Sequence, residues 1–260
     1  MTADYKTLRD TPVPVSATLM PSVRGYRQHP IDTSSPHYTE GVVELREIGI
    51  KGINHYHTPP NPPYNLCADG AVPQLWLRET VARKLLDVNA TLHPMGLELW
   101  VFDGWRPLEV QNYFHDVWMP ASLREERPDL GGDALWAEVE KYWSRGGDPK
   151  NIDPASPPPH FTGAAVDLTL RAIGGDNLYM GSIFDDVTER AHTDYFEHHI
   201  IARSFSDYEA RNNRRLLRHI MTRHGFNNLP SEWWHFSWGD QMWAKMTGAP
   251  AAHYGPWQPS

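Results

Sequence analysis

His160 and Asp167 lie seven residues apart and could be two ligands of one metal ion. The apolar run AAVDLTL (164–170) predicts a strand, in which Asp167 lies on the face whose other residues are small or polar. A turn at Thr162 and Gly163 would let the His160 imidazole fold back toward the Asp167 carboxylate. Zinc accepts imidazole nitrogen and carboxylate oxygen, and a catalytic zinc takes three protein ligands and a water. The alternative is a proline-rich loop that leads into an ordinary strand whose aspartate faces water.

A second cluster lies in the segment EWWHF, where Glu232 and His235 are three residues apart among large aromatic side chains. A carboxylate and an imidazole in such surroundings are costly to bury unless they are paired or bind a metal. A strand would place the two on opposite faces, so the segment must turn or bulge if both serve one site. His235 would then be a ligand, and Glu232, with its pKa raised by hydrophobic surroundings, would take a proton from water. Alternatively, Glu232 is a cap or an ion-pair partner and His235 is a core histidine.

Two more charged residues stand next to turns. Arg106 in DGWRP follows a predicted strand and is fixed by Pro107, so its guanidinium could stabilise an oxyanion. A surface salt bridge to Asp103 is the alternative. Asp185 in MGSIFDD could pair with a cationic group, or it could cap a helix.

Composition and charge exclude several classes of protein. The net charge of −8 and the absence of a Lys/Arg run argue against a nucleic-acid partner, and we interpret Arg211 to Arg218 as a solvated helix face. No apolar run of about 18 residues exists, so we expect no membrane span. The N-terminal MTADYKTLRD lacks the apolar centre of a signal peptide. Cys67 is the only cysteine, which excludes an internal disulfide, and together these features favour the cytoplasm.

Hydrophobic periodicity and turn residues predict an α+β fold in a single domain. We expect strands at 42–50, 97–107, 164–170 and 232–238, and helices at 74–92, 108–118, 133–143 and 206–226, the last capped by Ser206. Residues 1–45 are interpreted as an extended N-terminal arm, residues 46–245 as the main domain and residues 246–260 as a C-terminal tail. Neither a regular βαβ rhythm nor a glycine-rich phosphate loop is present in the sequence.

Taken in order, the segments DGWRP, HFTGAAVDLTL, MGSIFDD, NRRLLRHIMTRHGF and EWWHF resemble the D-alanyl-D-alanine dipeptidase family, the zinc enzymes of the vancomycin-resistance type. The resemblance covers roughly residues 45–240. It implies a small antiparallel sheet with helices packed around it, a fold that the family shares with zinc D,D-carboxypeptidases and the Hedgehog signalling domain.

The resemblance also implies a role for each candidate residue. Three residues would bind one Zn²⁺ ion: His160, Asp167 and His235. Glu232 would be the general base and Arg106 the transition-state stabiliser, while Asp185 would receive the free ammonium group of a dipeptide. The main domain would then be the catalytic domain, and the expected partner is a small D,D-dipeptide such as D-Ala-D-Ala.

Three features depart from the family pattern. Pro158 stands where a small hydroxyl residue is usual, and Trp105 replaces the usual tyrosine before the arginine. The proline loop at 57–63 and the N-terminal arm have no family counterpart, so either could cover the site. These departures keep open a zinc carboxypeptidase or amidase that acts on longer peptidoglycan peptides, and a metal-binding module without turnover.

Overall fold

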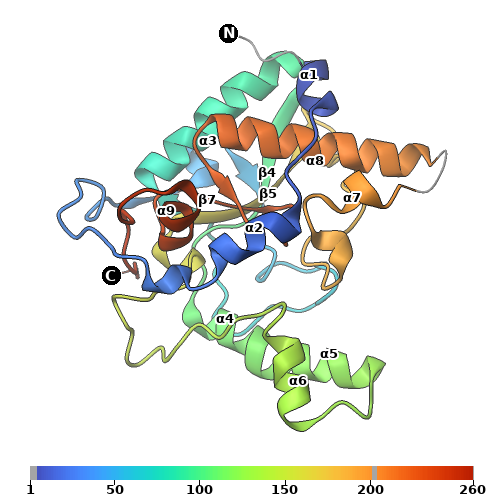
Figure 1. Cartoon of the computed structure of the whole chain (residues 1–260). Helices are drawn as coiled ribbons and strands as arrows, with labels where there is room; N and C mark the ends of the chain where they lie inside the picture. Colours follow the sequence, from blue (N-terminus) through green and yellow to red (C-terminus); the bar gives the residue numbers. More distant parts are fainter. Residues whose placement is uncertain (1–4, 201–203, 260) are drawn as a thin grey trace.

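The computed structural model describes residues 5–200 and 204–259, which form one α+β unit around a five-stranded sheet (Figure 1). The strand order is β2 (Lys51–Gly52), β4 (Leu97–Asp103), β5 (Ala165–Ala172), β7 (His235–Ser237) and β6 (Asn227–Asn228). All neighbouring pairs in this sheet are antiparallel except β2 and β4, which are parallel. A two-stranded antiparallel sheet joins β1 (Val42–Glu44) to β3 (Trp76–Arg78). The predicted fold class is confirmed.

Two long helices, α3 (Glu79–Leu92) and α8 (Phe205–Arg223), lie across the same side of the sheet (Figure 1). The predicted apolar stripe of α3 is buried, at Val81, Leu85, Val88 and Leu92. Leu77, which the same periodicity included, is also buried but belongs to β3. Alternate residues of β5 face these helices, so the helices and the central strands share one hydrophobic core.

The remaining helices are short and lie around the rest of the sheet. On the side away from α3 and α8 lie α4 (Leu108–Tyr113), a π-helical turn η4 (Phe114–Trp118), α5 (Met119–Glu126) and α6 (Gly132–Val139) (Figure 1). The others are α7 (Tyr195–His198), α9 (Gln241–Thr247) and the 3₁₀ turns η2 (Leu45–Ile48), η3 (His93–Met95), η5 (His160–Thr162) and η6 (Glu189–Ala191). No helix within the described ranges is long and apolar enough to cross a membrane.

The N-terminal segment is not extended as predicted. It contains α1 (Tyr5–Asp10), α2 (Ser16–Val23) and a 3₁₀ turn, η1 (Tyr26–Gln28). The guanidinium of Arg9 pairs with Glu209 of α8 at 2.7 Å, and the Ser16 amide donates to the Asp194 carboxylate at 2.8 Å. These contacts join residues about 180 to 200 positions apart, so local periodicity could not reveal them.

Helix α8 differs from its prediction in two respects. Its N-cap is Ser204 rather than Ser206, since the Ser204 hydroxyl accepts from the Asp207 amide. The basic stretch is not a solvated face, because Arg214 and Arg215 are buried. Arg214 donates to backbone carbonyls on the loop before α7, and Arg215 pairs with Glu197 of α7. Both arginines therefore attach α8 to neighbouring segments.

Replacing Leu168 by Ala tests the assignment of the core. Leu168 is fully buried in β5, so the cavity left by Leu168→Ala should lower the free energy of unfolding by about 2–5 kcal/mol. Leu86→Ala is the matched control, because Leu86 on α3 is 36% exposed, and it should change stability by only about 0.5 kcal/mol. Urea denaturation measures both. Equal losses for the two variants would contradict the placement of β5.

Candidate metal-dependent active site

The register of three neighbouring strands gathers the polar residues at the centre of the site. Asp103 of β4 lies opposite Asp167 of β5, and Asp167 lies opposite His235 of β7. His160 reaches the same place from η5, after which Gly163 turns the chain into β5 with a left-handed φ of 72°. A residue with a side chain would be strained in that conformation, so the glycine suits the turn predicted from the sequence.

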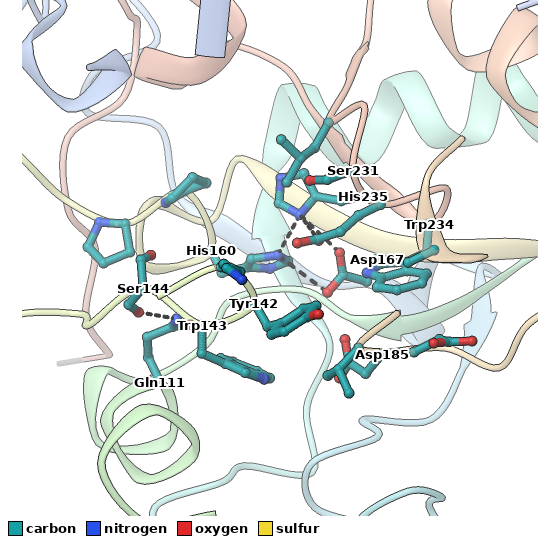
Figure 2. Close-up of a pocket in the computed structure, with 18 of the residues that line it drawn as sticks. Gln111, Tyr142, Trp143, Ser144, His160, Asp167, Asp185, Ser231, Trp234 and His235 are labelled. Atoms are coloured by element: carbon teal, nitrogen blue, oxygen red, sulfur yellow. Dashed lines mark hydrogen bonds and ion pairs between the residues drawn. The ribbon is translucent and has the colours of Figure 1, made fainter. Parts of the chain in front are cut away.

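His160, Asp167 and His235 form a compact buried trio (Figure 2). His160 Nε2 lies 3.1 Å from His235 Nδ1 and 3.4 Å from Asp167 Oδ2, while His235 Nδ1 lies 3.1 Å from Asp167 Oδ1. One ligand atom from each residue lies within 4.8 Å of the other two. The three side chains thus meet at a single point.

The hydrogen bonds around the trio favour the binding of a cation, because they orient a histidine lone pair and keep the Asp167 carboxyl ionised. His160 Nδ1 donates to the Gly104 carbonyl at 2.8 Å, which leaves the Nε2 lone pair directed at the trio. Burial opposes ionisation of Asp167, but the charges of His160 and the hydrogen bonds from both histidines outweigh it and lower the pKa of the carboxyl. Two imidazole nitrogens and an ionised carboxylate, all buried, are a donor set that fits zinc with one position open.

Glu232 lies beside the trio because the chain turns before β7. The Glu232 amide donates to the Leu229 carbonyl at 3.0 Å, and the Glu232 carbonyl accepts from the His235 amide at 3.4 Å. The predicted turn is therefore present, and it brings Glu232 Oε2 to 3.8 Å from His235 Nδ1. Burial raises the pKa of Glu232, and the nearby Asp167 charge adds to this effect, although His235 opposes it.

Arg106 is buried, so its pairing with Asp103 is not the surface salt bridge considered as an alternative. Its Nε donates to Asp103 at 2.8 Å, its Nη2 to Asp167 at 3.0 Å and to the Tyr56 hydroxyl at 2.9 Å. Nη1 donates to the Gln111 amide oxygen at 2.9 Å. Nη1 has a second hydrogen, and Arg106 lines the same cavity as the trio.

Asp185 is a buried acid rather than a helix cap. Its Oδ2 accepts from the hydroxyls of Tyr56 at 2.7 Å and Tyr64 at 2.8 Å. Burial and the charge of Asp167 raise the pKa of Asp185 to about 8. The residue has a φ of 57°, a left-handed conformation that aspartate tolerates better than most residues.

These residues surround a cavity of about 150 Å³, which the trio, Glu232, Arg106 and Asp185 all line. In Figure 2, Ser144 lies to the left of His160 and Asp185 lies below Asp167. Pro158, where the sequence departs from the family pattern, is part of the wall. Four other histidines, His55, His57, His198 and His199, are not among the lining residues.

Sequence reasoning missed several residues of the site. Tyr56 and Tyr64 lie on either side of the proline loop, and Tyr56 connects Arg106 to Asp185 through its hydroxyl. Asp103 was considered only as a surface partner of Arg106, yet it is fully buried and also lies 3.2 Å from His160 Nδ1. The aspartate at the end of a predicted buried strand was the available signal for Asp103. No local signal distinguishes the two tyrosines.

The α+β fold, the buried His-Asp-His trio and the neighbouring carboxyl of raised pKa fit a zinc metallopeptidase. A family model described as D-ala-D-ala dipeptidase matches residues 71–249, and the chain belongs to this family.

Curated relatives agree with the assignment. The chain is 32% identical to a D-alanyl-D-alanine dipeptidase of Synechocystis sp., over 77% of this chain and 83% of that protein. It is 39% identical to a D-alanyl-D-alanine dipeptidase of Enterococcus faecalis, over 63% of this chain and 73% of the relative. A solved vancomycin-resistance D,D-pentapeptidase in complex with Zn(II) aligns over 81% of this chain and 83% of its own, with 15% identity and a TM-score of 0.40. The family assignment rests on the sequence matches.

Replacing Asp185 by Asn should change how stability depends on pH. The pKa of Asp185 is about 8 in the folded state, against an ordinary value of 3.8, so between these values the folded protein keeps a proton that the unfolded chain releases. Asp185 therefore makes stability fall as pH rises through this window, by up to about 1.4 kcal/mol per pH unit. Asp185→Asn lacks this loss, so its free energy of unfolding should rise relative to wild type from pH 5 to pH 8. The free energy of unfolding of both proteins is measured by denaturation at each pH. A difference between them that stays constant from pH 5 to pH 8 would contradict the raised pKa.

Proposed function

We propose that this chain is a zinc-dependent D,D-dipeptidase that hydrolyses D-Ala-D-Ala or a close relative. One observation carries the proposal: a single cavity of about 150 Å³ is lined both by the metal-binding trio and by the buried acid Asp185. A free ammonium group held at Asp185 would place the adjacent peptide bond near the trio. A site of this size favours a short substrate over a protein chain.

In this proposal His160, Asp167 and His235 hold the metal. When bound, Zn²⁺ supplies a Lewis acid that polarises the scissile carbonyl and makes water more acidic. The Gly104 carbonyl and Asp103 carboxylate hold the His160 ring by its other nitrogen, which fixes the orientation of this ligand.

Glu232 acts as the general base and then as the general acid. Its raised pKa brings the carboxyl closer to the range in which it can both accept and return a proton near neutral pH. It would take the proton of the attacking water and deliver it to the leaving amine. The distance of 3.8 Å to His235 places the carboxyl next to the trio without making it part of the trio.

Arg106 stabilises the negative charge that develops on the carbonyl oxygen. Three carboxylates and a tyrosine around it hold its pKa well above the usual range despite burial, so it stays a cation. Its bonds to Asp103, Asp167 and Gln111 fix the guanidinium before substrate arrives, which is the arrangement that electrostatic stabilisation of a transition state requires.

Asp185 selects substrates with a free amino terminus. Its two tyrosine partners bind only Oδ2, and an ammonium group would favour the ionised form of the carboxyl. An acylated amine carries no charge and would leave the buried acid without a partner. This residue therefore favours dipeptidase activity over cleavage at the end of a longer chain.

Replacing Glu232 by Gln separates metal binding from catalysis. We expect Glu232→Gln to retain zinc, measured by elemental analysis, while the turnover of D-Ala-D-Ala falls by about 10²- to 10⁴-fold. Glu189→Gln is the control, because Glu189 is exposed and outside the cavity wall, and it should keep wild-type turnover. A fully active Glu232→Gln enzyme would refute the mechanism. A wild-type protein that binds zinc but turns over none of the D,D-peptides would favour the non-catalytic module.

Comparing D-Ala-D-Ala with its N-acetyl derivative tests the alternative, a carboxypeptidase or amidase acting on longer peptides. We expect kcat/KM to fall at least about 100-fold on acetylation, because the charge that Asp185 receives is lost. Asp185→Asn should reduce this discrimination. Efficient cleavage of the acetylated compound by wild type would support the alternative, which Pro158 and the additional loops keep open.

Compartment and partners are proposed from the sequence. The single cysteine favours the cytoplasm, and the net charge of −8 argues against a nucleic-acid partner. Fractionation of cells that make the protein would test the compartment, and recovery outside the cytoplasmic fraction would refute this assignment.

A further inference from the structure

The C-terminal segment, residues 250–259, is bound to the elements that carry the site. It follows the region that matches the family model, residues 71–249. The amides of His253 and Tyr254 donate to the Gly239 carbonyl at 2.7 and 3.1 Å. Gly239 comes two residues after the end of β7, the strand that carries one of the metal ligands. The C-terminal segment is therefore attached to the chain just beyond that ligand.

Arg78 attaches the same segment to the turn before β5. Its buried guanidinium donates through Nη2 to the Gly255 carbonyl at 3.2 Å and through Nε to the Thr162 carbonyl at 2.8 Å. The guanidinium also lies over the Tyr254 ring, 5.2 Å from its centroid. Thr162 is the last residue of η5, which begins with the metal ligand His160. One cation thus joins the C-terminal segment to the turn that carries a second ligand.

Trp257 connects the segments of two site residues through its backbone. Its amide donates to the Phe161 carbonyl at 3.0 Å, and its carbonyl accepts from the Trp105 indole at 2.8 Å. Phe161 directly follows His160, and Trp105 directly precedes Arg106. These two segments also contact each other, but the bond from the Arg106 amide to the His160 carbonyl is long, at 3.4 Å. Trp257 therefore adds two shorter hydrogen bonds where the segments meet.

The Trp257 side chain belongs to a small hydrophobic cluster at this junction. The buried members are Trp105, Leu108 and Phe161, and the cluster is separate from the main core. The Trp257 ring meets the Trp105 ring edge-on, with centroids 5.3 Å apart, and its centroid lies 5.7 Å from that of Trp76. Packing on Trp257 is therefore part of what holds the neighbours of the two site residues in place.

Asp185 is held independently of the C-terminal segment. The hydroxyls of Tyr56 and Tyr64 donate to its carboxylate. Within residues 5–200 and 204–259, no hydrogen bond or ring contact joins these three residues to the C-terminal segment. Any effect of the segment should therefore fall on metal binding and on stabilisation of the transition state, rather than on the group proposed to receive the substrate ammonium.

We propose that Trp257 is a positioning residue for the metal ligand and the arginine of the site. By fixing Phe161, it holds His160 in the orientation that metal binding needs. By fixing Trp105, it holds Arg106 where the guanidinium can meet the developing oxyanion. The part that concerns Arg106 rests on the proposed dipeptidase function, whereas the part that concerns His160 rests on the trio alone. Displacing a ligand weakens metal binding, and displacing a guanidinium slows the chemical step.

Replacing Trp257 by Ala should lower both zinc affinity and turnover. We expect zinc binding, measured by competition with a chelator, to weaken about 10-fold. The kcat for D-Ala-D-Ala should fall by about 10- to 100-fold while KM changes less than about two-fold, because Asp185 still receives the ammonium group. A role in folding alone would lower the melting temperature and leave both values of the folded enzyme unchanged. All measurements are made well below the lowest melting temperature.

Two further variants accompany this one. Trp257→Phe keeps an aromatic ring and the backbone bonds, so it should restore most of the zinc affinity and kcat. Trp136→Ala is the matched control, because Trp136 is 41% exposed on α6 and does not line the cavity, and it should change neither quantity.

Trp105→Phe tests the same contact from the other side. It keeps an aromatic ring and removes the indole N–H that donates to the Trp257 carbonyl. We expect kcat to fall by up to about 10-fold, in line with the loss of one hydrogen bond. If the two residues act through this contact, the double variant Trp105→Phe/Trp257→Ala should lose less than the product of the two single losses.

The inference is overturned if folded Trp257→Ala binds zinc and turns over substrate as wild type does, if KM alone changes, or if the losses of the two variants multiply. Should Trp257→Ala fail to fold, Trp105→Phe decides, and a wild-type kcat for that variant overturns the inference. The zinc measurement needs no substrate. A wild-type protein that binds zinc but hydrolyses none of the D,D-peptides would therefore refute the proposed function, while the effect of Trp257→Ala on zinc affinity would still test the positioning of His160.

Discussion

The site depends on the hydrogen bonds and ion pairs that the Arg106 guanidinium makes. It is buried and donates to Asp103 and Asp167 on two adjacent strands, to Gln111 of α4 and to Tyr56 beside the proline loop. Two carboxylates this close in a buried site would repel each other without a cation between them. Removing one partner of such a group leaves the others buried and unpaired, typically at a cost of about 3–5 kcal/mol. The same contacts that hold the strands, α4 and the loop together therefore also order the site.

The acids of the cavity differ because their surroundings differ. Asp167 contacts two histidines and Arg106, and its pKa is lowered despite burial. Glu232 and Asp185 have weaker or neutral partners, so burial dominates and their pKa values are raised. One acid is thus suited to remain an anion beside a metal, and two are suited to exchange a proton or to wait for a cationic ligand. Position in the fold, rather than residue type, assigns these roles.

The cavity is closed by segments that lie outside the central strands. Tyr56 and Tyr64, which flank the proline loop, donate to Asp185, and the N-terminal segment contributes Tyr26 to the cavity wall. Gln241 connects the N-terminal segment to the loop before His160. Residues that precede the region matched by the family model, residues 71–249, therefore contact or line the site.

The sequence by itself determined the candidate trio, Glu232, the α3 stripe and the need for a turn before His235, because residue types, short spacings and periodicity express these features locally. Only the tertiary structure decided that α1 and α2 pack on the domain, that Arg214 is buried, that Tyr56 and Tyr64 donate to Asp185, and that Tyr26 lines the cavity. Those outcomes depend on contacts between residues separated by many tens of positions, such as Tyr56 with Asp185. Such contacts follow from the register of the strands and the packing of loops over them, which no local pattern encodes.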